Sequence, residues 1–143
     1  MNVATILKAK GTAVETASAD LTLMDAAQVM VAKRIGAIVI VDNSGRIVGI
    51  ISERDIIREL ATHGAQASKR PVSAAMTRTV ITCARDDTLD DLMGQMTSRR
   101  FRHLPVIEAD ELVGIVSIGD VVKHHIAEVE MEKTALRDYI ATG

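Results

Sequence analysis

The sequence predicts a mixed α/β (α+β) fold in which one β-α-β-β-α unit occurs twice. The motif GIISERD at residues 49–55 returns 65 residues further along as GIVSIGD at residues 114–120, each time after a short apolar run. A Thr-Leu-x-Asp pattern that begins at Thr22 returns at Thr88, 66 residues further along. Each copy alone is too small to bury its apolar faces well, so we expect the pair to form the folding unit.

The outer elements of the first copy are a strand and two helices. Residues 14–16 predict a short strand, and Thr22 begins a helix with apolar residues at helical spacing. Ser52 begins the second helix, for which Gly64 is a suitable end. The second copy repeats this order, with a short strand at residues 80–82.

A hairpin is predicted at the centre of each copy. In the first copy, residues 37–41 and 47–51 flank an Asn-Ser-Gly turn, whose residues tolerate the backbone angles that a turn requires. In the second copy, the strands fall at residues 104–107 and 112–116.

These elements divide the chain into four segments. We expect repeat 1 at residues 1–64, a linker at 65–71, repeat 2 at 72–126 and a C-terminal helical extension at 127–143. The linker segment is polar, basic and ends in proline. The extension carries an apolar stripe on a charged helix, which favours an intramolecular or dimer contact over a membrane surface.

Composition favours an ordinary globular protein. The 143 residues are 48% hydrophobic and 25% charged, and the net charge of -2 gives no global attraction for nucleic acid or an anionic membrane. The longest apolar stretch, residues 35–41, is too short to span a bilayer. The charged Lys8 and Lys10 interrupt the region where a signal peptide would be apolar, and Cys83 is the single cysteine. We therefore expect a cytoplasmic location.

The duplicated motif also identifies a family. Both G-hydrophobic-x-S-x-x-D segments, in this order of elements, resemble a tandem pair of CBS domains. GIISERD, RRFRHLPV at residues 99–106 and GIVSIGDVVK at 114–123 are together similar to stand-alone bacterial CBS-pair proteins. The resemblance implies a regulatory or sensor module without catalysis, in which clefts between the repeats bind AMP, ATP or an adenine dinucleotide. It also implies a homodimer.

The motif residues suit a nucleotide chemically. Ser52 and Ser117 can donate to a phosphate oxygen at a helix start, where backbone N–H groups are exposed. Asp55 and Asp120, when ionised, can accept from both hydroxyls of a ribose. Ser-x-x-Asp is also a helix-capping pattern, and from spacing alone pure capping is favoured. The resemblance favours ligand binding instead.

An adenine base would need an aliphatic slot, because Phe101 and Tyr139 are the only aromatic residues. Strand residues of each copy can supply apolar walls and backbone groups, although core packing is an equal alternative for each. The candidates are Val14, Thr16, Ala37 and Ile38 in repeat 1, and Val80, Thr82, Leu104 and Pro105 in repeat 2.

The copies differ where a ligand would be discriminated. Repeat 1 has Gly36, which permits close backbone approach, and Arg54, whose guanidinium can pair with a phosphate. Repeat 2 has Arg100, Arg102 and His103 instead. We hypothesise that one site takes AMP and the other a related adenine compound such as NAD or NADH. For Arg99, Arg100 and Arg102, the alternative to phosphate binding is a solvated basic edge.

Two further functions are weighed against this one. The basic residues 99–102 allow nucleic-acid binding, although the chain lacks overall basicity and aromatic platforms. A dimeric scaffold that has lost its ligand sites is the other alternative. The sequence predicts no catalytic residues and no metal site, and it leaves the downstream effector protein unidentified.

Overall fold

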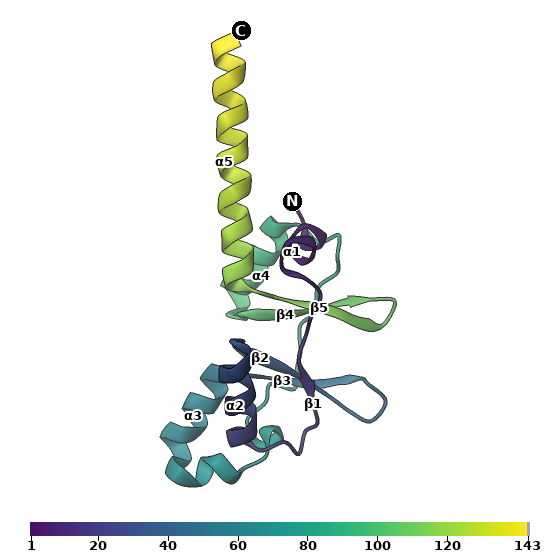
Figure 1. Cartoon of the computed structure of the whole chain (residues 1–143), viewed down its shortest axis with the longest axis vertical. Coiled ribbons are helices and arrows are strands. Elements are labelled where there is room, and N and C mark those ends of the chain that lie inside the picture. The colour runs from purple at the N-terminus through teal and green to yellow at the C-terminus, as the bar shows by residue number, and fades with distance from the viewer. Residues whose placement is uncertain (143) are drawn as a thin grey trace. The chain divides into compact units, whose positions relative to one another are not determined.

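The computed structural model describes residues 1–142, which form two packed units. Figure 1 labels their elements. The repeat-1 unit, Val14–Ile81, contains β1 (Thr16–Ala17), α2 (Leu23–Lys33), β2 (Ala37–Val41), β3 (Ile47–Ser52), α3 (Glu53–His63) and the 3₁₀ helices η1 (Gly64–Lys69) and η2 (Val72–Ala74). The repeat-2 unit joins residues 1–13 to residues 82–142 and contains α1 (Val3–Lys10), α4 (Leu89–Arg99), β4 (His103–Glu108), β5 (Glu111–Ser117) and α5 (Ile118–Thr142). The predicted α/β fold class is confirmed.

The repeat-1 unit is built on a three-stranded sheet. β2 lies between β1, which is parallel to it, and β3, which is antiparallel. The hairpin of β2 and β3 follows the predicted apolar runs. The buried cluster contains Leu23, Ala26, Met30, Ile38, Ile40, Ile51, Ile56, Val72 and Met76.

The repeat-2 unit keeps the antiparallel hairpin as β4 and β5. The strand predicted at residues 80–82 does not form, because pairing is limited to a single parallel bridge from Cys83 to Val106. The equivalent strand of repeat 1 is short and begins at Thr16, so Val14 lies outside it. These leading strands have few pairing partners, which makes their bounds hard to predict.

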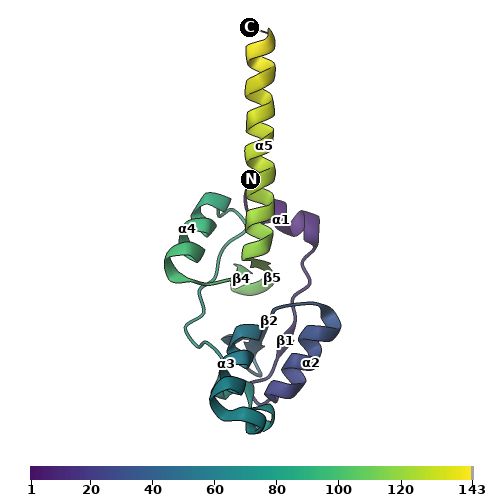
Figure 2. The ribbon, with the colours of Figure 1, turned by 90° about the vertical axis from the view of Figure 1, so that its left-hand side faces the viewer.

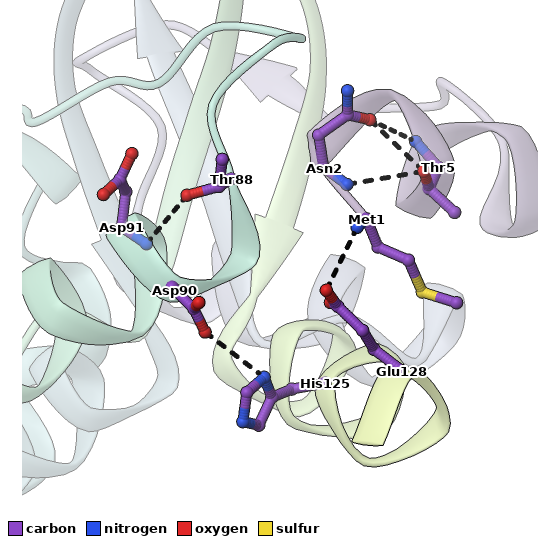
Figure 3. Close-up of polar contacts among 8 residues, drawn as sticks. All are labelled: Met1, Asn2, Thr5, Thr88, Asp90, Asp91, His125 and Glu128. Carbon is purple, nitrogen blue, oxygen red and sulfur yellow. Dashed lines mark hydrogen bonds and ion pairs between the residues drawn. The ribbon is translucent and has the colours of Figure 1, made fainter. Parts of the chain in front are cut away.

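The two copies also begin and end their first helix alike. The Thr22 hydroxyl accepts from the N–H of Asp25 at 3.1 Å, and Thr88 accepts from Asp91 at 3.2 Å (Figure 3). Both helices end at an arginine in the left-handed region, Arg34 with φ 55° in α2 and Arg100 with φ 59° in α4.

A helix that the sequence analysis did not predict precedes the first repeat. α1 is capped by Asn2, whose side chain accepts from the N–H of Thr5 at 3.2 Å (Figure 3). Its apolar residues Val3, Ile6 and Leu7 are buried, and the N–H of Val3 donates to the Asp87 carbonyl at 3.0 Å. The N-terminal helix therefore belongs to the packing of repeat 2.

The segment expected as a linker, residues 65–71, is largely helical. It forms most of η1, packs against α2 and α3, and buries Ala67. The chain then continues in the same unit, since the N–H of Val72 donates to the Leu21 carbonyl at 2.7 Å and Thr77 pairs with Ile50. The units therefore divide after residues 13 and 81.

Within the described residues, 1–142, no helix combines the length and the apolar character that crossing a membrane requires.

Candidate functional site

The two Ser-x-x-Asp motifs form matching structures at strand-to-helix junctions. In repeat 1, the N–H of Ser52 donates to Asp55 Oδ2 at 2.9 Å, and the N–H of Asp55 donates to Ser52 Oγ at 3.3 Å. In repeat 2, the N–H of Ser117 donates to Asp120 Oδ2 at 2.9 Å, and the N–H of Asp120 donates to Ser117 Oγ at 3.1 Å. Each pair therefore forms a reciprocal capping box, as the spacing predicts.

The Thr-x-x-Asp pairs are different. Thr22 and Thr88 each accept one hydrogen bond from the following helix, and within the described residues neither Asp25 nor Asp91 returns one to its threonine's N–H. Among residues 1–142, only the duplicated motif joins a hydroxyl and a carboxylate by reciprocal hydrogen bonds at a helix start. Such a pair can hold the helix together and also present polar atoms to a ligand.

The hairpins bring other predicted residues to the motifs. In repeat 1, the N–H of Glu53 donates to the Gly36 carbonyl at 3.0 Å, and Ala37 is the strand partner of Ser52. In repeat 2, the N–H of Ile118 donates to the Arg102 carbonyl at 2.8 Å, and His103 is the strand partner of Ser117. Two candidate residues therefore lie beside the motif in each copy.

Burial separates the remaining candidates into two groups. The side chains of Ala37, Ile38, Leu104 and Pro105 are buried, and Ile38 belongs to the core cluster, so core packing explains their apolar character. Thr16 is exposed, and Val14 is half-buried beside β1. The three candidate arginines, Arg54, Arg100 and Arg102, are exposed.

Two predicted repeat-2 residues are assigned to different units. Thr82 lies in the repeat-2 unit next to Cys83, whose N–H donates to the Pro105 carbonyl at 3.0 Å. Val80 lies in the repeat-1 unit, Val14–Ile81.

The two motif carboxylates have different cationic neighbours. Asp55 Oδ1 lies 3.3 Å from the Arg58 guanidinium, one turn along the same helix. Asp120 Oδ2 lies 2.7 Å from Lys10 Nζ, which comes from α1 and also donates to the Ile115 carbonyl at 3.0 Å. Sequence reasoning missed Lys10, because the N-terminal segment has no counterpart in the other copy.

These contacts set the protonation of Asp120. Burial alone would raise its pKa, but the hydrogen bonds from Lys10 and Ser117, together with the Lys10 charge, hold the pKa of Asp120 below its usual value. The carboxylate is therefore ionised at neutral pH and can accept hydrogen bonds.

The glycine of each motif has a packing role. A Cβ at Gly49 would lie 2.5 Å from Met76 Sδ and 3.1 Å from the Thr77 carbonyl oxygen. A Cβ at Gly114 would lie 2.8 Å from Leu7 Cδ2. The two glycines therefore allow other segments to cross the strand closely.

A pocket on the repeat-1 unit borders the motif without including its carboxylate. It is lined by α2, α3 and the segment between α2 and β2, and it includes Gly36 and Glu53 but neither Ser52 nor Asp55. Its lining is mostly apolar, and Val31 and Ile57 there are strongly exposed. These features are more typical of a protein contact surface than of a nucleotide site.

Nucleophilic chemistry is poorly supported at the cysteine. Burial, with a smaller contribution from the Asp87 charge, raises the pKa of Cys83 to about 12. Among residues 1–142, no three His, Cys, Asp or Glu side chains are grouped so that they could hold a metal ion.

The CBS domain model matches the sequence twice, at residues 11–62 and 72–126. The chain therefore belongs to the CBS-domain family. The mitochondrial CBS domain-containing protein CBSX3 of Arabidopsis thaliana is 32% identical over 149 residues, covering 99% of this chain and 72% of that protein. The chain spans 62% of the length of a second curated relative and 20% of the length of a third.

Solved structures give the same assignment. The crystal structure of a CBS-domain containing protein from Agrobacterium tumefaciens is 43% identical, with a TM-score of 0.85 over 87% of this chain and 99% of that chain. The CBS domain pair of protein MJ0100, solved in complex with 5′-methylthioadenosine and S-adenosyl-L-methionine, is 29% identical, with a TM-score of 0.79 over 90% of this chain and 98% of that chain.

Proposed function

We propose that this protein is a regulatory module that binds adenine nucleotides at its two Ser-x-x-Asp motifs. The observation that carries the proposal is the duplicated capping box, in which a carboxylate and a serine hydroxyl are fixed at a helix start. The ligands named for the MJ0100 domain pair both contain adenosine, which supports an adenosine compound as the ligand here.

Each part of the ligand has a candidate partner. Asp55 and Asp120 accept from the ribose hydroxyls, since an ionised carboxylate has no proton to donate. Ser52 and Ser117 face the phosphate, together with the N–H groups of the helix start. The base lies against the strands, through backbone groups of residues 37–38 in repeat 1 and 104–105 in repeat 2.

The charges near the motifs favour two unequal sites. In repeat 1, the exposed Arg54 follows Ser52 by two residues and pairs with a phosphate. In repeat 2, the exposed Arg100 and Arg102 supply the positive charge. We assign AMP to one site and a related adenine compound, NAD or NADH, to the other.

The proposed role is regulatory: ligand binding is coupled to a conformational equilibrium, and no reaction is catalysed. A ligand that binds one conformational state more tightly shifts the population toward that state, and an effector protein reads the change. We propose that the active form is a homodimer, which the exposed apolar residues Val31 and Ile57 support.

A calorimetric and thermal-shift panel of AMP, ADP, ATP, NAD, NADH and S-adenosylmethionine tests this function. We expect AMP to bind saturably and to raise Tm, because a ligand at 100 times its Kd stabilises the folded state by about 2.7 kcal/mol. We also expect a second site with a different ligand preference. If no adenine compound binds or shifts Tm, the scaffold alternative replaces this proposal, and RNA binding with a steep salt dependence would instead favour the basic residues 99–102.

A further inference from the structure

Helix α5 carries apolar side chains well beyond the part of it that packs on the repeat-2 unit. Every residue from Val129 to Thr142 is exposed. Figures 1 and 2 both show this part of α5 extending away from the other elements of its unit. An isolated helical segment of this length is marginal in water, and most helix stability in proteins comes from covering an apolar face. A covering partner is therefore expected.

The apolar residues of α5 follow a coiled-coil spacing. Separations alternate between four and three residues over nearly three heptads, which is the pattern of a and d positions. The five apolar side chains at these positions are between 39% and 69% exposed. The stripe consists of Val122, Ile126, Val129, Lys133, Leu136 and Ile140.

The contacts between the first turns of α5 and the rest of the unit are made by residues outside this stripe. The Val121 side chain is fully buried, His125 Nδ1 lies 3.6 Å from Asp90 Oδ1, and Glu128 Oε1 lies 3.3 Å from the Met1 amino group (Figure 3). Residues 121, 125 and 128 each precede a stripe residue by one position. Because neighbouring positions point about 100° apart on a helix, the stripe faces a different direction from these contacts.

We propose that α5 pairs with α5 of a second copy as a parallel two-stranded coiled coil. With Ile126 at position a, Glu132 is at position g and Arg137 at the following position e. A parallel pair places each g residue beside the e residue five positions later on the other helix, so Glu132 of each copy meets Arg137 of the other. An antiparallel pair loses both of these contacts.

Lys133 supports the same arrangement. It is the one polar residue at the a and d positions between 122 and 140. A single lysine at position a specifies register and oligomeric state at a cost in stability, and its long side chain can carry the ammonium group to solvent. This inference rests on the proposed homodimer, but it does not depend on nucleotide binding.

Disulfide cross-linking of the full chain tests the pairing. Val129→Cys and Leu136→Cys place a thiol at position d, and Ala135→Cys places one at position c on the outer face of the same helix. Under mild oxidation we expect covalent dimers to form at least tenfold faster through either d position than through Ala135→Cys. Equal rates at the three positions, or monomers only, would overturn the proposal.

A charge exchange tests the orientation. In the Val129→Cys background, Glu132→Arg or Arg137→Glu alone should slow cross-linking severalfold. Each change puts like charges at positions 132 and 137 of opposite helices, and the dimer contains this contact twice. The double exchange should restore the rate, and failure to restore it would overturn the parallel register. Sedimentation separates the two proposals: a dimer that does not cross-link through α5 refutes the coiled coil but keeps the homodimer, whereas a monomer refutes both.

Discussion

Lys10 Nζ lies 2.7 Å from Asp120 Oδ2, so a cation from the N-terminal helix contacts the motif carboxylate of repeat 2. The corresponding carboxylate of repeat 1, Asp55, has Arg58 from its own helix at 3.3 Å. The two copies of the motif therefore have the same capping geometry and different charge environments. This difference complements the sequence differences that led us to expect unequal ligands.

The Lys10 contact makes stability depend on pH. The pKa of Asp120 is lower in the folded protein than the ordinary value of 3.8 that we take for the unfolded chain. Its stabilising effect is therefore complete above that value and is lost as pH falls through the folded-state pKa. We expect Asp120→Asn to lower the free energy of unfolding by about 1 kcal/mol at pH 7 and to have a shrinking effect below pH 4. Urea unfolding between pH 3 and 7 measures this difference.

Lys10→Met is the matched variant on the other side of the pair. It should reproduce the pH-dependent part of the Asp120→Asn effect, whereas Lys8→Met, at an exposed position on the same helix, should not. Equal effects of the two lysine variants would show that the pair contributes nothing specific.

The ligand role of the motif carboxylates can be separated from capping. We expect Asp55→Asn and Asp120→Asn each to weaken binding at one of two sites by roughly 10- to 100-fold, because hydrogen bonds to charged groups contribute about 1.5–3 kcal/mol. Calorimetry with AMP and NAD measures both sites.

Asp25→Asn and Asp91→Asn are the controls for this experiment, because they have the same spacing at a helix start without the reciprocal box. Their affinities should match that of the unaltered protein. If all four variants lose stability and keep ligand affinity, the motif only caps its helices.

The motif glycines should differ in their tolerance of alanine. Gly49→Ala brings a Cβ against both Met76 and the Thr77 backbone, whereas Gly114→Ala meets only the flexible Leu7 side chain at close range. We expect a cost of about 1–3 kcal/mol at Gly49 and a smaller one at Gly114. Chemical denaturation gives both values, and a larger loss at Gly114 would contradict this reasoning.

Cys83 should be slow to react in the folded protein. With a pKa of about 12, its thiolate fraction at pH 8 is roughly 1000-fold lower than that of a thiol with the ordinary value of 9.0. Labelling with a chromogenic disulfide at pH 8 should therefore be slow in buffer and rapid in denaturant. Fast labelling of the folded protein would mean that the site opens readily.

The repeated part of the fold was predictable from the sequence. Hairpins, helix starts and the Ser-x-x-Asp junctions depend on neighbours close in sequence, and two copies of each pattern gave two independent indications. For example, the strand pairing of Ala37 with Ser52 follows from a hairpin whose turn and apolar runs are local. The pairing of His103 with Ser117 follows in the same way.

The unpredicted features depend on distant residues. Lys10 and Asp120 are 110 positions apart, and no periodicity links them. The α1 helix is short and has no second copy, and its burial depends on contacts such as that between Leu7 and Gly114. Residues 1–13 pack with the second repeat, and contacts between segments so far apart in the chain leave no local signal in the sequence.

The discontinuous repeat-2 unit imposes an order on folding during synthesis. Residues 14–81 are contiguous, so the repeat-1 unit can fold once this stretch has left the ribosome. α1 is translated before this stretch, but the Asp87 carbonyl and β5 that it packs against are translated after it. Val3, Ile6 and Leu7 must therefore stay without their native contacts while most of the chain is made. α1 can therefore bury its apolar side chains only after the second repeat has emerged, when repeat 1 can already be folded.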